Sequence, residues 1–425
     1  MAQRRAERRI VTERSVFDDR FGPDALAWVH DAFVRTPVCG LADLPHVPDL
    51  EPTDVEFILR QACYAKISRQ GRFNRALISA AARGRPLSTA LPRAWRAEVQ
   101  RLGFTVAHRR SSARWSAEAA ASLLRGAAVY LVHLLRICLP HERRRYRDSH
   151  GPTAYFHSVA AENLPIGLTE LPPTDVVSWF EDRSHELADI RTVATRVDIP
   201  MSVTRRGRLV VGRTLPLAVP AAPREAWRFI RSSSECLVAS LLELLRGRWV
   251  SAMLASERID VELLQATDGK GQATLHLFNT SGHARRPLWT LIAPRFGMRT
   301  VCYHYSTNAE GVLHRSDQPE VVPANSWRLC WWDEQLAWDS RQAAFLSETA
   351  ERPGAVSIVG PISFVATRQR VPTEAEGSVT VFDVTPIGSA WRASWSSEVY
   401  YTQELVESFV CTLLEATAAH GLTVA

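Results

Sequence analysis

The sequence predicts a mixed α/β protein in which a mainly helical N-terminal region precedes a parallel β-sheet. Three observations support this fold class. Apolar residues recur at helical spacing through the first 150 residues, where strand signals are sparse. From about residue 151, short runs rich in β-branched and aromatic residues alternate with helix-length segments, the pattern of βαβ units. The composition, 46% apolar and 23% charged, is that of a globular chain.

Charge and cysteine usage narrow the class of protein. The 425 residues have room for two or three domains of roughly 100–200 residues. Lys66 and Lys270 are the only lysines, so arginine carries the net charge of +6. This bias is explained either by a GC-rich genome or by a use of arginine to bind phosphate and carboxylate groups with two parallel hydrogen bonds. The seven cysteines are scattered without a CxxC pair, which disfavours a structural zinc site and predicts a reducing, cytoplasmic location.

The first region, residues 1–150, is expected to be mainly helical. Residues 53–84 have apolar positions at helical spacing, and Asp54 could cap the start of that helix. Residues 103–108 give the best strand signal of the region. No apolar segment follows the basic start of the chain, so no secretory signal is expected.

The stretch 117–140 is the most membrane-like part of the sequence. Four charged or titratable residues interrupt it, namely Glu118, Arg125, His133 and Arg136. We therefore expect a buried or interfacial helix, because a spanning helix needs about 20 apolar residues with few charges. The basic run 141–145 that follows could hold the chain at the inner face of the membrane as a peripheral contact, and a solvated helix end is the alternative.

Residues 151–365 are expected to form one α/β lobe. Strands are predicted at 154–159, 175–180, 273–279, 300–305, 327–332 and 356–360. Helices are predicted at 223–265, 286–296 and 335–349. Because strands and helices alternate, the sheet is expected to be parallel.

Residues 378–425 are expected to begin a second lobe. The segment 363–377, with Pro372 and alternating charges, is typical of a linker. A strand at 379–384, a helix at 396–420 and the start of another strand follow. One βα unit cannot bury both faces of a sheet, so this lobe is expected to be incomplete or to pack onto the first.

The residues that follow predicted strands form the candidate site, since ligands of open parallel sheets bind at the carboxyl ends of strands. The strongest candidates follow the strand 273–279 and are Asn279, Ser281, Gly282 and His283. A helix is expected to begin near Arg286, so that its N–H groups and dipole favour an anion or a sugar hydroxyl. An ordinary loop capped by Ser281 is the alternative, because the turn lacks a full glycine-rich fingerprint.

A second group of candidates follows the strand 300–305. Ser306 and Asn308 offer hydroxyl and amide groups that, with the neighbouring tyrosines, suit a sugar. Alternation along the strand places His304 on the face opposite Tyr303. A lone strand histidine is more commonly a satisfied core residue than a ligand.

Acidic residues supply the last candidates. Asp383 lies near the end of the strand 379–384, at the inferred cleft between the lobes, where it could act as a base or hold a ribose. Asp333 and Glu334 follow the predicted strand 327–332, and helix capping is their more common role.

Several chemistries have no support in the sequence. It contains no GxxxxGK[ST], HExxH or GxSxG motif, so the common P-loop, metalloprotease and α/β-hydrolase signatures are missing. No grouping of His, Cys and acids has metal-ligand spacing, so neither a metal nor another cofactor is expected. The arginines are mixed with 45 acidic residues, which disfavours a nucleic-acid-binding face.

Four parts of the chain carry a family resemblance. The first is RRPLWTLIAPRFGMRTVCYHYSTN (285–308), and the second joins WWDEQLAWDSRQAAFL (331–346) to VSIVGPISF (356–364). The third joins VTVFDVTP (379–386) to YYTQELVESFVCTLLEA (400–416), and the fourth joins AYFHSVAAENLP (154–165) to DVVSWFED (175–182). Together they resemble bacterial glycosyltransferases of the GT-B type that assemble capsule or lipopolysaccharide chains.

The resemblance implies two Rossmann-like lobes facing a cleft, with the acceptor on the first lobe and the activated sugar on the second. It also implies transfer of a sugar from a nucleotide sugar donor to a glycan or lipid-linked glycan acceptor, without a bound metal. It assigns no catalytic residue in this chain, and the incomplete second lobe puts catalysis by this chain alone in question. The alternative function is a non-catalytic α/β binding or scaffold protein of a polysaccharide assembly machinery or the membrane surface.

Overall fold

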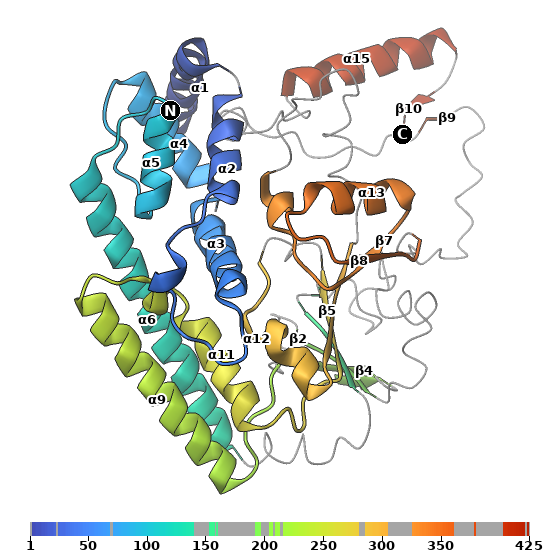
Figure 1. The fold of residues 1–425 in the computed structure, drawn as a ribbon. Coiled ribbons are helices and arrows are strands. Elements are labelled where there is room, and N and C mark those ends of the chain that lie inside the picture. The colour runs from blue at the N-terminus through green and yellow to red at the C-terminus, as the bar shows by residue number, and fades with distance from the viewer. Residues whose placement is uncertain are drawn as a thin grey trace.

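The computed structural model consists of a helical layer packed against one large sheet (Figure 1). The residues that it describes are 2–22, 24–68, 71–139, 153–157, 159, 192–196, 204–206, 209–212, 216–279, 285–304, 325–360, 378–379, 403–420 and 423–424. Within these residues the protein is mixed α/β with a largely parallel sheet, as the sequence predicts.

Helices dominate the described N-terminal part of the chain. Their bounds are α1 (Ala2–Phe21), α2 (Ala25–Arg35), α3 (Pro52–Ser68), α4 (Arg72–Ala82), α5 (Arg93–Arg101) and α6 (His108–Cys138), with the 3₁₀ helix η1 (Leu41–Asp43) between α2 and α3. The strand predicted at 103–108 is wrong. Val106 makes only an isolated bridge with Leu87, because no further strand in this part of the structure extends the pairing.

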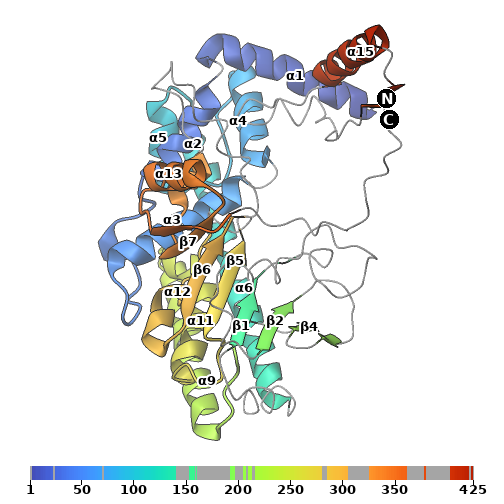
Figure 2. The same cartoon turned by 90° about the vertical axis from the view of Figure 1, so that its right-hand side faces the viewer.

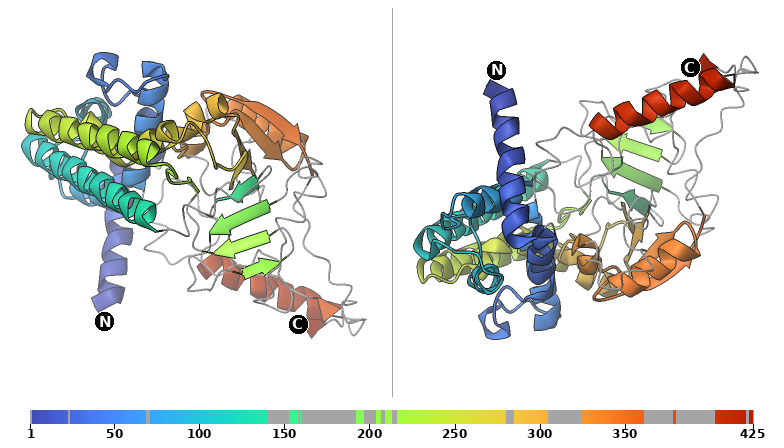
Figure 3. Two further views of the ribbon diagram at one scale, coloured as in Figure 1. Left: turned by 90° about the horizontal axis from the view of Figure 1, so that it is seen from below. Right: turned by 90° about the horizontal axis from the view of Figure 1, so that it is seen from above.

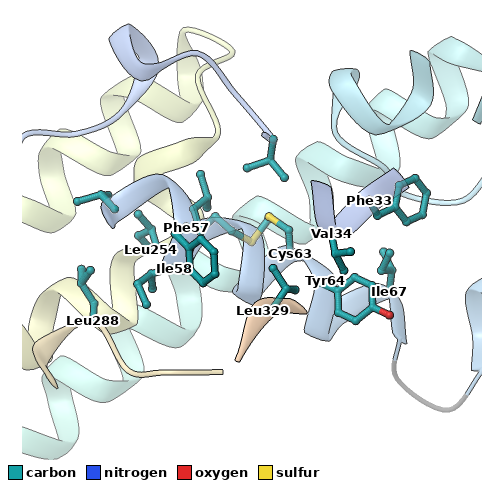
Figure 4. Close-up of a cluster of buried hydrophobic side chains, with 14 of the residues drawn as sticks. Phe33, Val34, Phe57, Ile58, Cys63, Tyr64, Ile67, Leu254, Leu288 and Leu329 are labelled. Atoms are coloured by element: carbon teal, nitrogen blue, oxygen red, sulfur yellow. The ribbon is translucent and has the colours of Figure 1, made fainter. Parts of the chain in front are cut away.

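Helix α3 lies at the centre of the apolar core. Its buried side chains include Phe57, Ile58, Cys63, Tyr64 and Ile67. Figure 4 shows these side chains close to Leu254, Leu288 and Leu329, which come from the second half of the chain. One core therefore serves both the helical layer and the sheet.

A second helical group follows the first strands of the sheet. Its helices are α9 (Pro223–Leu245), α10 (Val250–Met253) and α11 (Ala255–Ala266). The sequence predicts helix throughout 223–265, but the chain turns after α9 at Gly247, whose φ of +81° is the left-handed conformation that favours glycine. The long helices α6 and α9 lie side by side (Figure 3).

The strands form one eight-stranded sheet. Their bounds are β1 (Thr153–Phe156), β2 (Thr192–Arg196), β3 (Thr204–Arg206), β4 (Leu209–Gly212), β5 (Leu275–Asn279), β6 (Arg299–Tyr303), β7 (Glu334–Ala337) and β8 (Ala355–Ile358). Their order is β3-β4-β2-β1-β5-β6-β7-β8, and all neighbours are parallel except β3 and β4. The sheet runs beside the helices (Figure 2).

Register decides which strand residues face the helical core. Tyr155 of β1 lies opposite His276 of β5, and Phe278 lies opposite Cys302 of β6. His276 and Phe278 point to the face that packs on Trp289, whereas Asn279, one residue further, lies on the other face.

Two predicted boundaries in this region are wrong. Residues 327–332 were predicted as a strand, but the first half lies in the 3₁₀ helix η7 (Asn325–Leu329) and the second half is irregular. The strand is β7, which was predicted as the start of a helix. β7 pairs with strands on both sides, so ladder hydrogen bonds override the weak strand propensity of its sequence. The following helix, α13 (Ser340–Thr349), begins after Asp339, whose carboxylate accepts a hydrogen bond from a first-turn N–H at 2.9 Å.

A small parallel pair ends the described chain. Its elements are β9 (Ser378–Val379), α15 (Gln403–Ala419) and β10 (Thr423–Val424), and β9 pairs with β10. The strand–helix–strand order predicted for 378–425 is therefore present. The strand predicted at 175–180 lies outside the described residues.

Polar contacts join α3 to the sheet region. The guanidinium of Arg60 donates hydrogen bonds of 3.0 and 2.7 Å to the carboxylate of Glu351. The amide of Gln61 donates to the carbonyl of Leu329 at 2.7 Å and accepts from the N–H of Arg286 at 2.9 Å. These bonds fix the loops around the sheet to a helix that lies more than 200 residues earlier in the chain.

Candidate functional site

The order in which strands are added to the sheet reverses between the parallel neighbours β1 and β5. β2 and β4 extend the sheet on one side of β1, while β5, β6, β7 and β8 extend it in order on the other. At such a switch point the loops after the two central strands leave in opposite directions, and the gap between them is where open α/β sheets bind ligands. The carboxyl ends of β1 and β5 therefore define the candidate site of the described chain.

Asn279 ends β5 at this switch point, as the sequence predicts. Its backbone pairs with Tyr303 of β6, and its side chain is largely buried, with 9% of the residue exposed. The remaining predicted site residues lie outside the described residues, namely Ser281, Gly282, His283, Ser306, Asn308 and Asp383. The structure thus describes one of the seven candidates, and that one lies at the expected edge.

His157, which sequence reasoning did not select, is the second polar residue of this edge. It follows β1 directly, and its N–H donates to the carbonyl of Leu277 at 2.8 Å, which extends the pairing of β1 with β5. Its ring stacks on Phe278, with centroids 3.8 Å apart and planes 12° from parallel. Tyr155 contacts the ring edge-on at 4.8 Å, so aromatic neighbours fix the imidazole.

A histidine pair lies beneath the edge. Nε2 of His157 and Nδ1 of His276 are 3.0 Å apart and form a hydrogen bond, in which one nitrogen carries the proton and the other accepts it. The ring of Trp289 packs edge-on against His276 at 4.8 Å. Nε2 of His276 has no hydrogen-bond partner among the described residues.

Burial keeps both imidazoles neutral. Loss of solvent lowers the pKa of His276 to about 3, against the smaller opposing effect of a hydrogen bond with the backbone of Ala273. Burial, together with the neighbouring His276, lowers the pKa of His157 well below its ordinary value. At neutral pH His157 is therefore an uncharged group that can donate or accept a hydrogen bond.

His304 is a buried residue of the core, as its position in a predicted strand favoured. It follows β6, and its Nε2 donates to the side-chain oxygen of Gln335 at 3.1 Å. Its backbone N–H donates to the carbonyl of Leu336, and its own carbonyl accepts from the indole of Trp338. Its contacts with β7 and the adjoining Trp338 integrate His304 into the fold.

The start of the helix after β5 differs from the prediction. Helix α12 is Trp289–Ile292 and continues as the 3₁₀ helix η5 (Ala293–Phe296), so it begins three residues after Arg286. The N–H of Leu288 donates to the carboxylate of Glu257 at 3.1 Å. This N–H group is therefore already hydrogen-bonded to a carboxylate of the chain itself. The helix is also short, so its dipole would attract a ligand only weakly.

Arg286 is instead part of the core. It is 1% exposed, and its guanidinium lies over the rings of Trp331 and Trp332, 5.0 and 5.6 Å from their centroids. The group forms an ion pair with Asp333 and a 2.9 Å hydrogen bond with the hydroxyl of Thr290. This arrangement fixes the residues directly before α12.

The paired acids Asp333 and Glu334 lie at the amino end of β7, away from the carboxyl edge of the sheet. Asp333 pairs with Arg286, and Glu334 pairs with Arg299. Each carboxylate thus has an arginine partner within the fold, which accounts for both acids as structural groups. In the described part of the chain no cluster of three or more His, Cys, Asp or Glu residues is arranged to hold a metal ion.

The sheet order and its switch point define a Rossmann-like α/β protein, in which His157 and Asn279 lie at the carboxyl ends of β1 and β5. Residues 236–425 match the family model described as "Polysaccharide biosynthesis PFTS motif protein". The match supports a protein of polysaccharide biosynthesis, and it includes β5 and its carboxyl end. No curated protein and no solved structure matches the chain.

Proposed function

We propose that the chain transfers a sugar from a nucleotide-activated donor to a growing surface glycan, with the carboxyl ends of β1 and β5 as part of the binding site. The observation that carries the proposal is the match of residues 236–425 to a polysaccharide biosynthesis family. The sheet adds a second argument, because its switch point is where parallel α/β sheets bind ligands such as nucleotides.

The two described polar residues at the edge suit a sugar. An amide and a neutral imidazole both donate and accept hydrogen bonds, as sugar hydroxyl groups do. Because His157 is uncharged, it can orient an acceptor hydroxyl through a hydrogen bond. Asn279 would hold a second hydroxyl on the same ligand.

The candidates outside the described residues extend this proposal along the sequence. Ser281, Gly282 and His283 follow β5, and Ser306 and Asn308 follow β6. In a parallel sheet both loops leave from the same edge, so these residues would contact the same ligand as Asn279. Asp383 would act from the second lobe, on the donor side.

Thermal-shift measurements with nucleotides and nucleotide sugars test the proposal, because a ligand that binds the native state alone raises its midpoint. We expect one nucleotide class to raise the midpoint, and the variants Asn279→Ala and His157→Gln to reduce this shift. His157→Gln keeps a hydrogen-bonding group near His276 and so separates ligand binding from core packing. His108→Gln, an exposed histidine at the start of α6, is the matched control.

A radiolabelled sugar-transfer assay with the responding donor then distinguishes transfer from binding. Incorporation into a glycan acceptor that is lost in Asn279→Ala supports the proposal. A folded protein that shows no shift with any nucleotide or nucleotide sugar would instead favour the non-catalytic scaffold function.

A further inference from the structure

Helices α6 and α9 expose an unusual number of large apolar side chains on their outer surface, which we call the α6–α9 face. Its members are Leu124, Leu131, Val132, Leu135 and Leu139 from α6 and its end, and Trp227, Val238, Leu241, Leu242 and Leu245 from α9. Leu124, Leu135 and Leu245 are 71%, 67% and 75% exposed. Soluble monomers rarely expose apolar residues in continuous rows, so this face is expected to have a partner.

The face is continuous because of how the two helices pack. The hydroxyl groups of Tyr130 and Ser234 lie 3.0 Å apart across the seam between them, and His133 packs edge-on against Phe229. Along α6 the contacts advance from Tyr130 to His133 while along α9 they go back from Ser234 to Phe229, so the two helices are antiparallel, and Figure 3 shows them side by side. Leu124, seven residues before Leu131, lies on the same side of α6.

The inner side of α6 belongs to the fold. Nε2 of His133 lies 3.0 Å from the carboxylate of Asp260, and the guanidinium of Arg136 donates to the carbonyl of Leu217 at 2.9 Å. Gly126 lies so close to α11 that a Cβ there would be 2.7 Å from the Cβ of Ala255. Among the described helices α6 alone is long and apolar enough to cross a membrane, but these contacts fix it along the protein and leave only its outer side for lipid.

An apolar recess adjoins the exposed indole of Trp227. It has a volume of about 290 Å³ and lies between the end of α6 and the start of α9. Its lining residues are Ile137, Pro220, Ala221, Ala222, Pro223, Ala226, Trp227 and Ile230. An apolar opening beside a tryptophan suits the boundary between lipid headgroups and acyl chains.

The charge around the face is strongly positive. Exposed arginines lie on α6, on α9 and in the turn after α9. They are Arg109, Arg110, Arg114, Arg125, Arg224, Arg228, Arg231, Arg246 and Arg248. The exposed acids of the same helices are Glu118 and Glu235. Of these arginines, in the described structure, Arg228 and Arg231 alone have acidic partners. Most of the positive charge is thus available to an external partner.

We propose that the α6–α9 face docks on the surface of an anionic lipid bilayer, with the leucines inserted at the headgroup boundary and the arginines on lipid phosphates. Apolar insertion and electrostatic attraction together are the two signals that give stable peripheral binding. A second copy of the chain is disfavoured as the partner, because a symmetric contact would bring the same arginines together. The inference does not rest on the proposed function.

Vesicle flotation with the full chain tests the proposal. The vesicles are phosphatidylcholine alone or phosphatidylcholine with about a third phosphatidylglycerol. The variant Leu131→Glu/Leu135→Glu introduces two carboxylates on the face at exposed positions, where folding does not need the leucines. Leu41→Glu, at an exposed leucine of η1 outside the face, is the matched control. Circular dichroism and melting temperature verify that each variant folds.

We expect the wild type and Leu41→Glu to float with the anionic vesicles and to bind them less at high salt. Loss of two inserted leucines is expected to weaken the partition at least about tenfold, since each buried methylene contributes about 0.8 kcal/mol. Absence of flotation with anionic vesicles, or flotation unchanged in Leu131→Glu/Leu135→Glu, would overturn the proposal. The proposal would also be overturned if light scattering showed that the wild type is a dimer and that this double variant is a monomer. Sugar-transfer measurements with soluble acceptors do not depend on this face, so the two proposals fail independently.

Discussion

The buried histidine pair predicts that the protein loses stability in mild acid. His276 has a folded-state pKa of about 3, whereas an unfolded histidine titrates near 6.5. The unfolded state therefore binds more protons between these values. The contribution of His276 to stability is fully present above about pH 6.5 and is lost as the pH falls toward 3.

The magnitude follows from the size of this window. One proton difference changes the free energy of unfolding by about 1.4 kcal/mol per pH unit. Between about pH 6.5 and pH 5, protonation of His276 in the unfolded state alone is expected to lower the free energy of unfolding by about 2 kcal/mol. The pKa of His157 is also lowered, so the pair as a whole contributes more than this amount.

Urea unfolding followed by tryptophan fluorescence, from about pH 7 to about pH 5, measures the effect. The variant His276→Asn keeps a polar atom near the position of Nδ1 for His157 but does not titrate. We expect it to be less stable than the wild type at pH 7 and to lose about 2 kcal/mol less on acidification. His108→Gln is expected to behave as the wild type. Equal acid losses in the wild type and His276→Asn would refute the reasoning, as would a measured pKa of His276 above 6.

Three further predictions concern packing. Gly126→Leu is expected to destabilise by about 2 kcal/mol or more, because the helix pair has no room for a side chain there. Asp333→Asn is expected to cost about 3 kcal/mol because it leaves the buried guanidinium of Arg286 without its counter-charge, while Arg286→Met is expected to cost about 2 kcal/mol because it removes the charge together with its hydrogen bonds and leaves a half-exposed carboxylate. Gly354→Ala is expected to cost at least about 2 kcal/mol, since its Cβ would be 1.8 Å from the backbone oxygen of Trp332. Urea unfolding measures all of them.

Matched variants separate these effects from the general cost of substitution. Ala121→Leu on the exposed side of α6 and Gly40→Ala, which has ordinary space around it, are expected to change stability by less than about 0.5 kcal/mol. Arg101→Met, at an exposed arginine of α5, is the control for Arg286→Met. A buried-site variant that is no less stable than its control would contradict the packing on which the prediction rests.

Local sequence signals were sufficient for several strands and insufficient for others. β5 and β6 are apolar runs with β-branched or aromatic residues, and their pattern alone predicts them. β7 has the sequence EQLA, which favours a helix, and it is a strand because β6 and β8 pair with it. Such pairing depends on residues far apart in the chain, so no local pattern contains it.

The same limit applies to the candidate site. Asn279 could be predicted because it ends an evident strand, and any strand end of a parallel sheet is a candidate. His157 lies inside the strand predicted at 154–159, whereas the strand ends at Phe156, and its place beside His276 depends on β1 being the neighbour of β5. Strand order is a property of the whole sheet, which a single sequence does not reveal.

The shared core also bears on whether the matched segment could fold without the helices before it. The matched family segment begins at residue 236, inside α9 and not at its end. The segment alone would lose the contacts of α9 with α6 and those of Arg286 and Leu329 with Gln61. We therefore expect a fragment of residues 236–425 to be less stable than the full chain, because its part of the core would lose the packing that α3 and α6 supply.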